Sequence, residues 1–448
     1  MSTEKESDVS VASVIANLFE GQLPFRVEAF DASVAEPTIE SPASELTLKI
    51  LTPDALVRVL RRPGELGLAR AFVAGDIELD GDLDALFSLE VPPLGHLFSP
   101  STLGPLLRLI GASALRPLAA PRIEARQRGT LHSRRRDADA ISHHYDVSNR
   151  FYEMVLGPSM TYSCAVFAGA DDTLEVAQRR KVDLICRKLD LQPGMRLLDV
   201  GCGWGAMAVH AAQHFGVSVV GVTLSTEQQS YATRRARELG VGERCEFRLQ
   251  DFRDVRDGPF DAISSIGMSE HVGRRSLAPY AQQMFDLLAP GGRFLNHAIG
   301  RPISMKDDPR PSRRSEAWRQ TQIAWGLRGP SRVGSDFIER YVFPDGELHD
   351  VGTMVSLFQA HGLEVRHLES LREHYAITLR HWVDNLVKRF DEAVDEVGEQ
   401  RARVWRLYMA GSAVNFEHHH LEIHQVLTVK SVRGRAGMDL RPDFEPEF

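Results

Sequence analysis

The sequence predicts an α/β protein with a doubly wound, mostly parallel, seven-stranded sheet and a small α+β domain before it. Three observations predict this fold class. Strand-like segments alternate with helical stretches over most of the second half of the chain, as in sheets whose parallel strands are joined by helices. One strand-like segment, 196–200, runs into Gly201, Gly203 and Gly205 and continues as a helix. The first 115 residues show short alternating strands and helices without that regular order.

The smaller domain is expected over residues 21–115, after a partly disordered segment at 1–20. Its expected elements are strands at 23–30 and 45–51, a helix that begins at Thr52-Pro53, a second helix that ends at Gly75, and a short strand after it. A linker at 91–101 leads to a further helix. These residues alone indicate an accessory domain and nothing more specific.

Residues 116–140 form an arginine-rich linker. Up to residue 136 this segment has a single acid, Glu124, against Arg116, Arg122, Arg126, Arg128, Arg134, Arg135 and Arg136. A solvated connector and a patch that meets phospholipid headgroups both fit this composition; each basic residue near an anionic membrane contributes about 1 kcal/mol. Nucleic acid is disfavoured, because no aromatic residues interleave with the arginines and the net charge is −8.

The large domain is expected over residues 141–435. Its expected helices lie at 173–189, 206–215, 225–239, 276–288, 374–396 and 400–418, and its strands at 196–200, 217–223, 244–249, 260–266, 291–298, 363–371 and 421–432. Residues 300–345 lack clean periodicity and carry Trp318 and Trp325, so we expect an inserted lid there. Residues 436–448 are expected to form a loose tail.

Composition limits the class of protein. Four cysteines without a CxxC spacing predict a reducing compartment, with neither disulfides nor zinc. The consecutive histidines at 418–420 would point in different directions on a helix, so no metal site is predicted. The N-terminus lacks a signal-peptide pattern, and no apolar run reaches about 18 residues. We therefore expect a cytoplasmic protein that would meet a membrane only peripherally.

The glycine-rich turn predicts a cofactor site. Three glycines after a strand leave bare backbone where a ligand can approach closely. Asp199 precedes the first glycine, and no Gly-Lys-Ser/Thr follows, so the turn is not a phosphate-binding P-loop. The pattern resembles the S-adenosylmethionine (SAM) motif of Rossmann-like class I methyltransferases.

Six motifs in order extend this resemblance: HHYDVSNRFY, TYSCAVF, LLDVGCGWG, GVTLSTEQ, SSIGMSEHVG and HYAITLRHW. Over roughly residues 140–430 the chain resembles the cyclopropane-fatty-acid synthase family, which includes the mycolic-acid methyltransferases. GLARAFVAGDIELDGDL is similar to the N-terminal lipid-binding domain of longer members. RYVFPDGELHD and the HYAITLRHW region resemble most the branch that makes 10-methylene, tuberculostearic-type fatty acids.

The resemblance implies a SAM site and a bicarbonate ion. The implied cofactor residues are Tyr162, Ser163, Leu197, Leu198, Asp199, Val200, Gly201, Cys202, Gly203, Trp204, Gly205, Thr223, Leu224, Ser225, Gln228, Gln250 and Asp251. The implied bicarbonate ligands are Glu270, His297 and Tyr375, with the backbone of Cys164 and Ile266. Without the resemblance, Glu270 could belong to a surface turn, His297 to the core, and Tyr375 to helix packing.

The implied reaction is methyl transfer to the cis double bond of an unsaturated acyl chain in a phospholipid bilayer, through a carbocation. Tyr145, Tyr375 and a tryptophan of the expected lid are candidate aromatic faces for that cation. Ser269 stands where cyclopropane-forming members often have Phe, which favours a 10-methylene product, and a separate reductase would then complete the methyl branch. Ser412 replaces a family cysteine, which argues against covalent catalysis. The alternatives are a cyclopropane synthase, a small-molecule methyltransferase and an inactive lipid-binding protein; a homo-oligomer is compatible with all of them.

Overall fold

The computed structural model describes residues 10–87, 89, 100–125, 132–145, 147–169, 171–302 and 336–444. Most of the lid expected at 300–345 lies outside these residues. Contacts divide the chain into two units. Unit 1 comprises Met1–Arg126, Ser335–Val342 and Phe390–Val414, and unit 2 comprises Gln127–Gly334, Phe343–Arg389 and Asn415–Phe448. The grouping counts Phe390–Val414 with unit 1, whereas the sequence analysis assigned these residues to the large domain; the boundaries expected there remain predictions.

Unit 1 has a four-stranded sheet in the order β2-β1-β3-β4, in which only β1 and β3 are parallel. The strands are β1 Arg26–Ala29, β2 Val34–Ala35, β3 Thr47–Ile50 and β4 Ile77–Asp80. The helices before the linker are α1 Val11–Leu18, α2 Pro53–Arg61, α3 Glu65–Ala74, α4 Leu83–Phe87 and α5 Pro100–Ile110. Helix α1 begins inside the segment expected to be partly disordered, because Ser10 and Ser13 form a reciprocal capping box there.

The sheet of unit 2 has seven strands in the order β10-β11-β9-β8-β5-β6-β7. They are β5 Arg196–Val200, β6 Ser218–Thr223, β7 Cys245–Leu249, β8 Phe260–Ile266, β9 Leu288–Gly300, β10 Glu364–Ser370 and β11 Glu422–Val429. The five strands from β5 to β9 pair in parallel, and β11 pairs antiparallel with both β9 and β10. The predicted doubly wound, mostly parallel sheet is confirmed.

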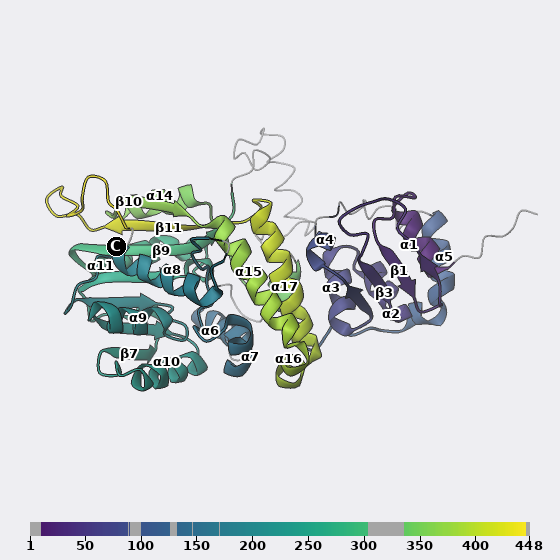
Figure 1. The fold of residues 1–448 in the computed structure, drawn as a ribbon, viewed down its shortest axis with the longest axis horizontal. Coiled ribbons are helices and arrows are strands. Elements are labelled where there is room, and N and C mark those ends of the chain that lie inside the picture. The colour runs from purple at the N-terminus through teal and green to yellow at the C-terminus, as the bar shows by residue number, and fades with distance from the viewer. Residues whose placement is uncertain are drawn as a thin grey trace, which may run out of the picture. The chain divides into compact units, whose positions relative to one another are not determined.

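Helices cover both faces of this sheet (Figure 1). On one face lie α8 Leu174–Lys188, α9 Ala206–Phe215 and α10 Thr226–Glu238, and on the other α11 Leu277–Leu287 and α14 Val351–Ala360. Each face has its own buried cluster of aliphatic and aromatic side chains, as expected for strands that are apolar on both sides. The carboxyl ends of the parallel strands therefore form one edge at which loops can build a site.

Unit 2 has three further helices besides those named for the two faces of the sheet. They are α6 Arg134–Tyr145, α7 Asn149–Leu156 and α15 Arg372–Lys388. Helix α6 begins inside the segment predicted as an arginine-rich linker. The helix predicted over 374–396 is divided at Arg389 into α15 and α16 Phe390–Val397, and α17 Glu399–Glu417 follows. Short α13 Asp336–Tyr341 completes the described helices of unit 1.

Candidate active site

A cavity of about 160 Å³ lies at the carboxyl ends of β5, β6 and β8 in unit 2. Many of the residues predicted to bind the cofactor line it: Tyr162, Ser163, Asp199, Val200, Gly201, Cys202, Gly203, Trp204, Thr223, Leu224, Gln228, Gln250 and Asp251, together with Tyr145 and Ile266. Four predicted residues do not line it. Leu197 and Leu198 are fully buried in β5, while Gly205 and Ser225 precede α9 and α10 as N-caps.

The glycine turn forms one wall of this cavity. Gly201, Gly203 and Gly205 all have positive φ, at 74°, 52° and 81°, which glycine adopts without the steric cost that other residues incur. A Cβ on Gly203 would meet no atom within 4 Å, so this position is open toward the site. A Cβ on Gly205 would lie 2.9 Å from the Cβ of Ala232, so Gly205 permits close packing of the turn against α10.

Asp199 presents an unpartnered oxygen at the end of β5. Its side chain is 2% exposed, and its Oδ1 accepts a hydrogen bond of 2.7 Å from the Ser264 hydroxyl. Its Oδ2 has no hydrogen-bond partner among the described residues. Burial raises the pKa of Asp199 to about 6, because the ionised carboxylate loses hydration that it does not fully regain. A ligand that donates to Oδ2 would satisfy this group.

Hydrogen bonds in the turn between β6 and α10 orient the side chain of Gln228. The Thr223 hydroxyl donates to its Oε1 at 2.7 Å, and the backbone N–H of Ser225 donates to Thr223 Oγ1 at 3.2 Å. Because the carboxamide oxygen is already occupied, the NH₂ group is the part of Gln228 left to meet a ligand.

Aromatic rings also line the cavity, one of them from the glycine turn itself. Tyr145 lies 6.1 Å from both Tyr162 and Trp204, measured between ring centroids, and all three residues line the cavity. Trp204 is 2% exposed and donates its indole N–H to Asn149 Oδ1 at 2.7 Å. Of the three residues, Trp204 is buried and Tyr145 and Tyr162 are half-buried, so the wall offers ring faces to the cavity.

Glu270 lies in a second, smaller cavity of about 20 Å³, which Ser269 and His349 also line. Its Oε1 accepts the backbone N–H of Ile299 at 2.7 Å, and its Oε2 has no partner among the described residues. Burial raises the pKa of Glu270 to about 7. A carboxyl group with this pKa can hold or release a proton near neutral pH.

His297 lies next to Ile266 across the β8–β9 pair, and its carbonyl accepts the N–H of Gly267 at 2.8 Å. The side chain is 1% exposed, and neither ring nitrogen has a partner among the described residues. Burial, together with the nearby Lys181 and Lys188, holds the pKa of His297 well below its usual value. The imidazole is therefore neutral, with one N–H that can donate a hydrogen bond and one nitrogen that can accept one.

Tyr375 and Cys164 are both buried, and they meet at one backbone carbonyl. The N–H of Tyr375 and the thiol of Cys164 both donate to Leu371 O, at 3.1 and 3.6 Å. The Tyr375 ring packs against Trp382, which also contacts Tyr162. His297, Tyr375 and Cys164 line neither of the two described cavities; Ile266 is the predicted catalytic residue at the wall of the larger one.

The sequence and structure were compared with known proteins. Residues 132–426 match the family model described as "Mycolic acid cyclopropane synthetase", which is more than half of the chain. This chain belongs to the mycolic acid cyclopropane synthetase family. It is 43% identical over 438 residues to "Probable fatty acid methyltransferase Rv3720" of Mycobacterium tuberculosis, covering 95% of this chain and 96% of that relative. It is 32% identical to the cyclopropane-fatty-acyl-phospholipid synthase of Escherichia coli K12, covering 86% and 88%.

The structure of this chain is similar to solved structures of mycolic acid cyclopropane synthases. The complex of CmaA1 with SAH and CTAB superposes with a TM-score of 0.58 at 31% identity, covering 65% of this chain and 98% of CmaA1. MmaA2 of Mycobacterium tuberculosis superposes with the same TM-score at 32% identity, covering 67% and 100%. The covered share corresponds in size to the large domain, and the class I methyltransferase fold is therefore established for it.

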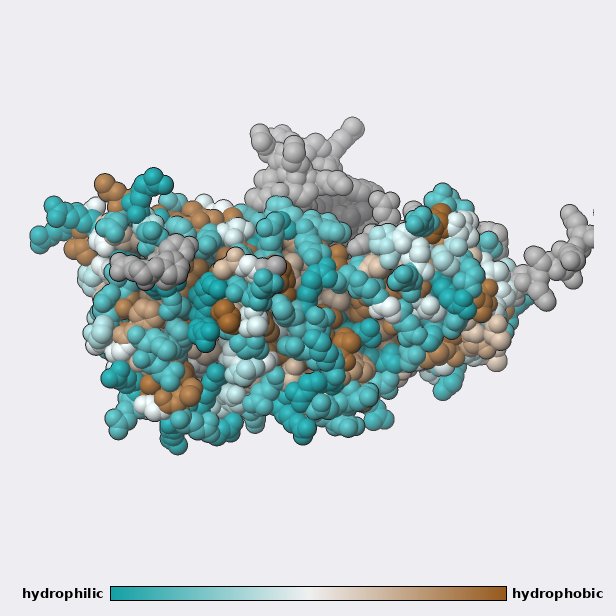
Figure 2. Space-filling model, in the orientation of Figure 1, coloured by the Kyte–Doolittle hydropathy of each residue, from teal (hydrophilic) through white to brown (hydrophobic). Residues whose placement is uncertain are grey.

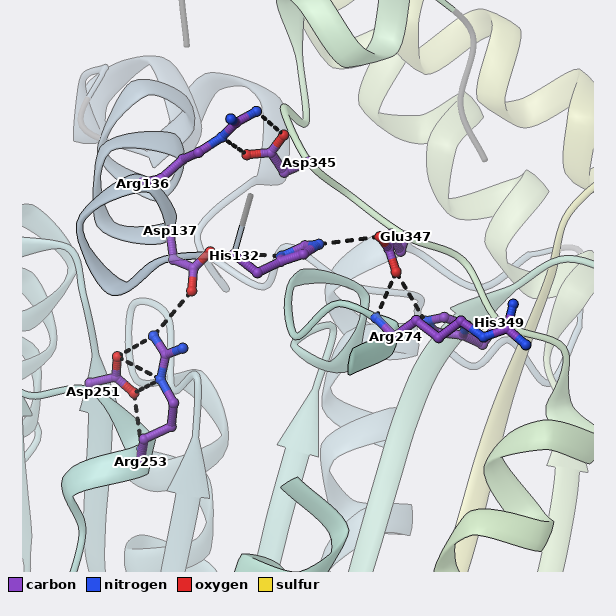
Figure 3. Close-up of polar contacts among 9 residues, drawn as sticks. All are labelled: His132, Arg136, Asp137, Asp251, Arg253, Arg274, Asp345, Glu347 and His349. Carbon is purple, nitrogen blue, oxygen red and sulfur yellow. Dashed lines mark hydrogen bonds and ion pairs between the residues drawn. The ribbon is translucent and has the colours of Figure 1, made fainter. Parts of the chain in front are cut away.

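Two charged residues that the sequence analysis missed, Asp137 and Arg253, also line the larger cavity and contact the predicted Asp251 (Figure 3). The Arg253 guanidinium donates to Asp251 at 2.6 Å and to Asp137 at 3.0 Å, and all three residues line the cavity. The pKa of Asp137 is raised because burial outweighs the attraction of Arg253. Asp137 is at the start of α6, so this ion pair holds α6 against the cofactor loops.

The same segment is tied to the loop that follows α13. His132 lies 3.3 Å from Glu347 Oε1, and Glu347 Oε2 accepts the N–H of Arg274 at 2.6 Å (Figure 3). Arg136 donates to Asp345 at 2.6 Å. Arg134 is also engaged, with Asp254 at 2.8 Å. Arg134 and Arg136 thus take part in ion pairs within unit 2 and do not form a free basic patch.

Proposed function

We propose that this chain is a SAM-dependent C-methyltransferase that acts on the cis double bond of unsaturated acyl chains in phospholipids and forms a 10-methylene fatty acid. The observation that carries the proposal is the position of Ile266. It lines the cofactor cavity and is the register partner of His297, so the unpartnered histidine is next to the wall of that cavity. Family membership supports the same chemistry.

The cofactor supplies, when bound, a methyl group on a positively charged sulfur. If the π electrons of an alkene took this methyl group, its bond to sulfur would break, S-adenosylhomocysteine would leave, and a cation would remain on the acyl chain. Water would capture that cation, so the protein must exclude water. Trp204, which is buried, and Tyr145 and Tyr162, which are half-buried, offer ring faces to a cation, worth on the order of 2 kcal/mol when desolvated. The product forms when the cation loses a proton.

Two residues of this chain are suited to hold a small base that takes that proton. Glu270 Oε2 and the His297 nitrogens are buried and lack partners among the described residues, which is uncommon unless a ligand or a reaction uses them. A bicarbonate ion fits them, because it carries both an O–H donor and acceptor oxygens. We propose that Glu270, His297 and Tyr375 hold it, with the backbone of Cys164 and Ile266, and that it supplies a small base.

The finer assignment to a methylene product rests on Ser269 and on one relative. Ser269 is 3% exposed and lines the same small cavity as Glu270, so a small side chain stands beside the proposed centre. The chain is also 32% identical to tuberculostearic acid methyltransferase UfaA1 of Mycobacterium tuberculosis, covering 90% of this chain. A methylene product would require a separate reductase to give the methyl branch.

Cyclopropane formation is the second candidate, supported by the similarity to the Escherichia coli synthase. For either product, the substrate would be reached at a membrane surface. No helix in the described part of the chain is long and apolar enough to cross a bilayer. On the face shown in Figure 2, hydrophobic residues are scattered among hydrophilic ones. We propose peripheral attachment to the inner face of the membrane.

The test is mass spectrometry of membrane fatty acids after expression in a host that lacks such enzymes. We expect one added CH₂ with the unsaturation retained; a cyclopropane ring would indicate the second candidate. The Glu270→Gln variant is expected to give neither product while binding S-adenosylhomocysteine as tightly as the wild type. Unchanged lipids with the wild-type protein, together with methylation of a soluble compound or no cofactor binding, would contradict the proposal.

A further inference from the structure

A buried lysine faces the cofactor cavity without a paired acid. Lys181 lies on α8, is 1% exposed and lines the cavity. Among the described residues, its ammonium donates one hydrogen bond, to Ser163 Oγ at 2.9 Å. An ammonium group has three N–H donors, so two remain for another partner. A buried charge without a counter-charge is costly, which indicates that a ligand completes this group.

Ser163 points to the kind of ligand. Its hydroxyl oxygen accepts from Lys181, so its own hydrogen is directed to a different acceptor. Ser163 is 8% exposed and also lines the cavity. The O–H of Ser163 and the N–H groups of Lys181 therefore present neighbouring donors with a net positive charge. Such an arrangement suits a small anion with at least two oxygens.

The protein's own acids do not fill this role. Asp199 is the carboxylate whose charge acts on Lys181, and no ion pair joins the two among the described residues. Asp199 Oδ1 accepts the hydrogen bond from Ser264. The other titratable groups near Lys181 are Cys164 and Cys186, and both are buried thiols. Burial lowers the pKa of Lys181 to about 8, so the ammonium form still dominates at neutral pH.

We propose that Lys181 and Ser163 bind a carboxylate-type anion, either the α-carboxylate of the cofactor's amino-acid end or a carbonate ion. This inference rests on the proposed function. The cofactor is the favoured source, because Asp199 Oδ2 lines the same cavity and lacks a partner among the described residues. A cation on one side and an unsatisfied carboxylate oxygen on the other match the zwitterion of an amino acid.

Lys188 is a matched control on the same helix. It is two turns further along α8 and is also 1% exposed. Unlike Lys181, it contacts Glu369 and donates to Gln425 Oε1 at 2.7 Å. Lys188 thus has its counter-charge within the protein and needs no ligand. Replacing either lysine by methionine keeps a similar volume. Lys181→Met removes a charge that has no paired acid, whereas Lys188→Met leaves Glu369, whose side chain is 35% exposed and can be hydrated.

The test is calorimetric titration of the full-length protein with S-adenosylhomocysteine and with its decarboxylated analogue. The wild type is expected to prefer the carboxylated ligand by about tenfold or more. The Lys181→Met variant is expected to bind both ligands with the affinity that the wild type has for the analogue. Lys188→Met should keep the wild-type preference, and Lys181→Arg should restore much of it.

A second arm identifies the source of the anion. The ¹³C line width of bicarbonate is measured with increasing protein in the Glu270→Gln background, in which the bicarbonate site proposed above lacks one of its ligands. If Lys181→Met keeps the ligand preference but abolishes bicarbonate broadening, the site binds carbonate. If neither quantity changes, or if both lysine variants weaken both ligands alike, the proposal is overturned. Failure of the wild type to bind S-adenosylhomocysteine would instead contradict the proposed function, and the bicarbonate arm would still test the site.

Discussion

Two buried glutamates show how the surroundings of a side chain decide its role. Glu124 receives hydrogen bonds from Arg70, Arg340 and Tyr341 at 2.6 to 3.0 Å, and these partners hold its pKa below the ordinary value. Glu270 receives a single backbone N–H among the described residues, and its pKa rises to about 7. The first carboxylate stabilises the fold, whereas the second is left ready to exchange a proton.

The raised pKa of Glu270 predicts a pH-dependent stability. Its folded-state pKa of about 7 lies above the ordinary value of 4.5, so its contribution is fully present below about 4.5 and is lost as the pH rises through 7. Glu270→Gln removes this loss. The unfolding free energy of the variant minus that of the wild type is expected to rise by on the order of 3 kcal/mol between pH 4.5 and 8.

Urea unfolding at several pH values measures this difference. Glu238→Gln is the control, because the Glu238 side chain is 65% exposed and hydrated. Its difference from the wild type should be flat across the same range. A flat profile for Glu270→Gln as well would show that Glu270 is not held in a dehydrated site.

At the scale of elements, the turn between β5 and α9 combines two kinds of glycine. Gly203 faces open space, while Gly205 packs closely against α10 and β7, where a Cβ would lie 3.0 Å from Phe247 Cζ. The first keeps backbone exposed to the cofactor cavity, and the second sets how closely α9 and α10 approach. The two positions should therefore respond differently to the same substitution.

Gly205→Ala is expected to destabilise the protein by about 2 kcal/mol or more, from positive φ and overpacking together. Gly203→Ala should cost only about 1 kcal/mol of stability but weaken S-adenosylhomocysteine binding, because the new methyl group would project into the cavity. Thermal unfolding and calorimetry separate the two effects. Equal loss of stability in both variants would contradict this division of roles.

At the scale of the whole molecule, segments far apart in sequence build each unit. Arg340 and Tyr341 belong to α13, yet they meet Glu124 within unit 1, and Arg403 of α17 contacts Glu78 at 3.1 Å. Unit 2 in turn joins the residues before β5 with those after α14. The accessory domain therefore includes segments from the C-terminal half of the chain as well as the N-terminal residues.

Glu124→Gln is expected to lower the stability of unit 1 by about 3 kcal/mol, because it leaves Arg70 without its buried counter-charge. Cofactor binding lies in unit 2 and should be unchanged. Urea unfolding monitored together with S-adenosylhomocysteine affinity checks both expectations. A parallel loss of affinity would show that Glu124 supports the cofactor site as well.

Sequence patterns predicted the regular parts of this protein well. The strand boundaries of β5, β6, β7 and β8 follow from short runs of apolar residues that end at glycines or polar turns, and the cofactor wall follows from local spacing around Gly201. Prediction was weaker where a local signal is short or competes with tertiary contacts. The capping box of α1 and the break between α15 and α16 were missed for this reason.

The sequence by itself determined the fold class, the family and most residues of the cofactor wall, because these depend on periodicity and on motifs that are contiguous in the chain. Only the tertiary structure decided which charges are paired. In the sequence, Glu124 is only the single acid of an arginine-rich segment, and nothing distinguishes Lys181 from other lysines in predicted helices. Folding buried both, gave Glu124 three partners and left Lys181 facing a cavity, because burial and pairing depend on neighbours that are distant in sequence.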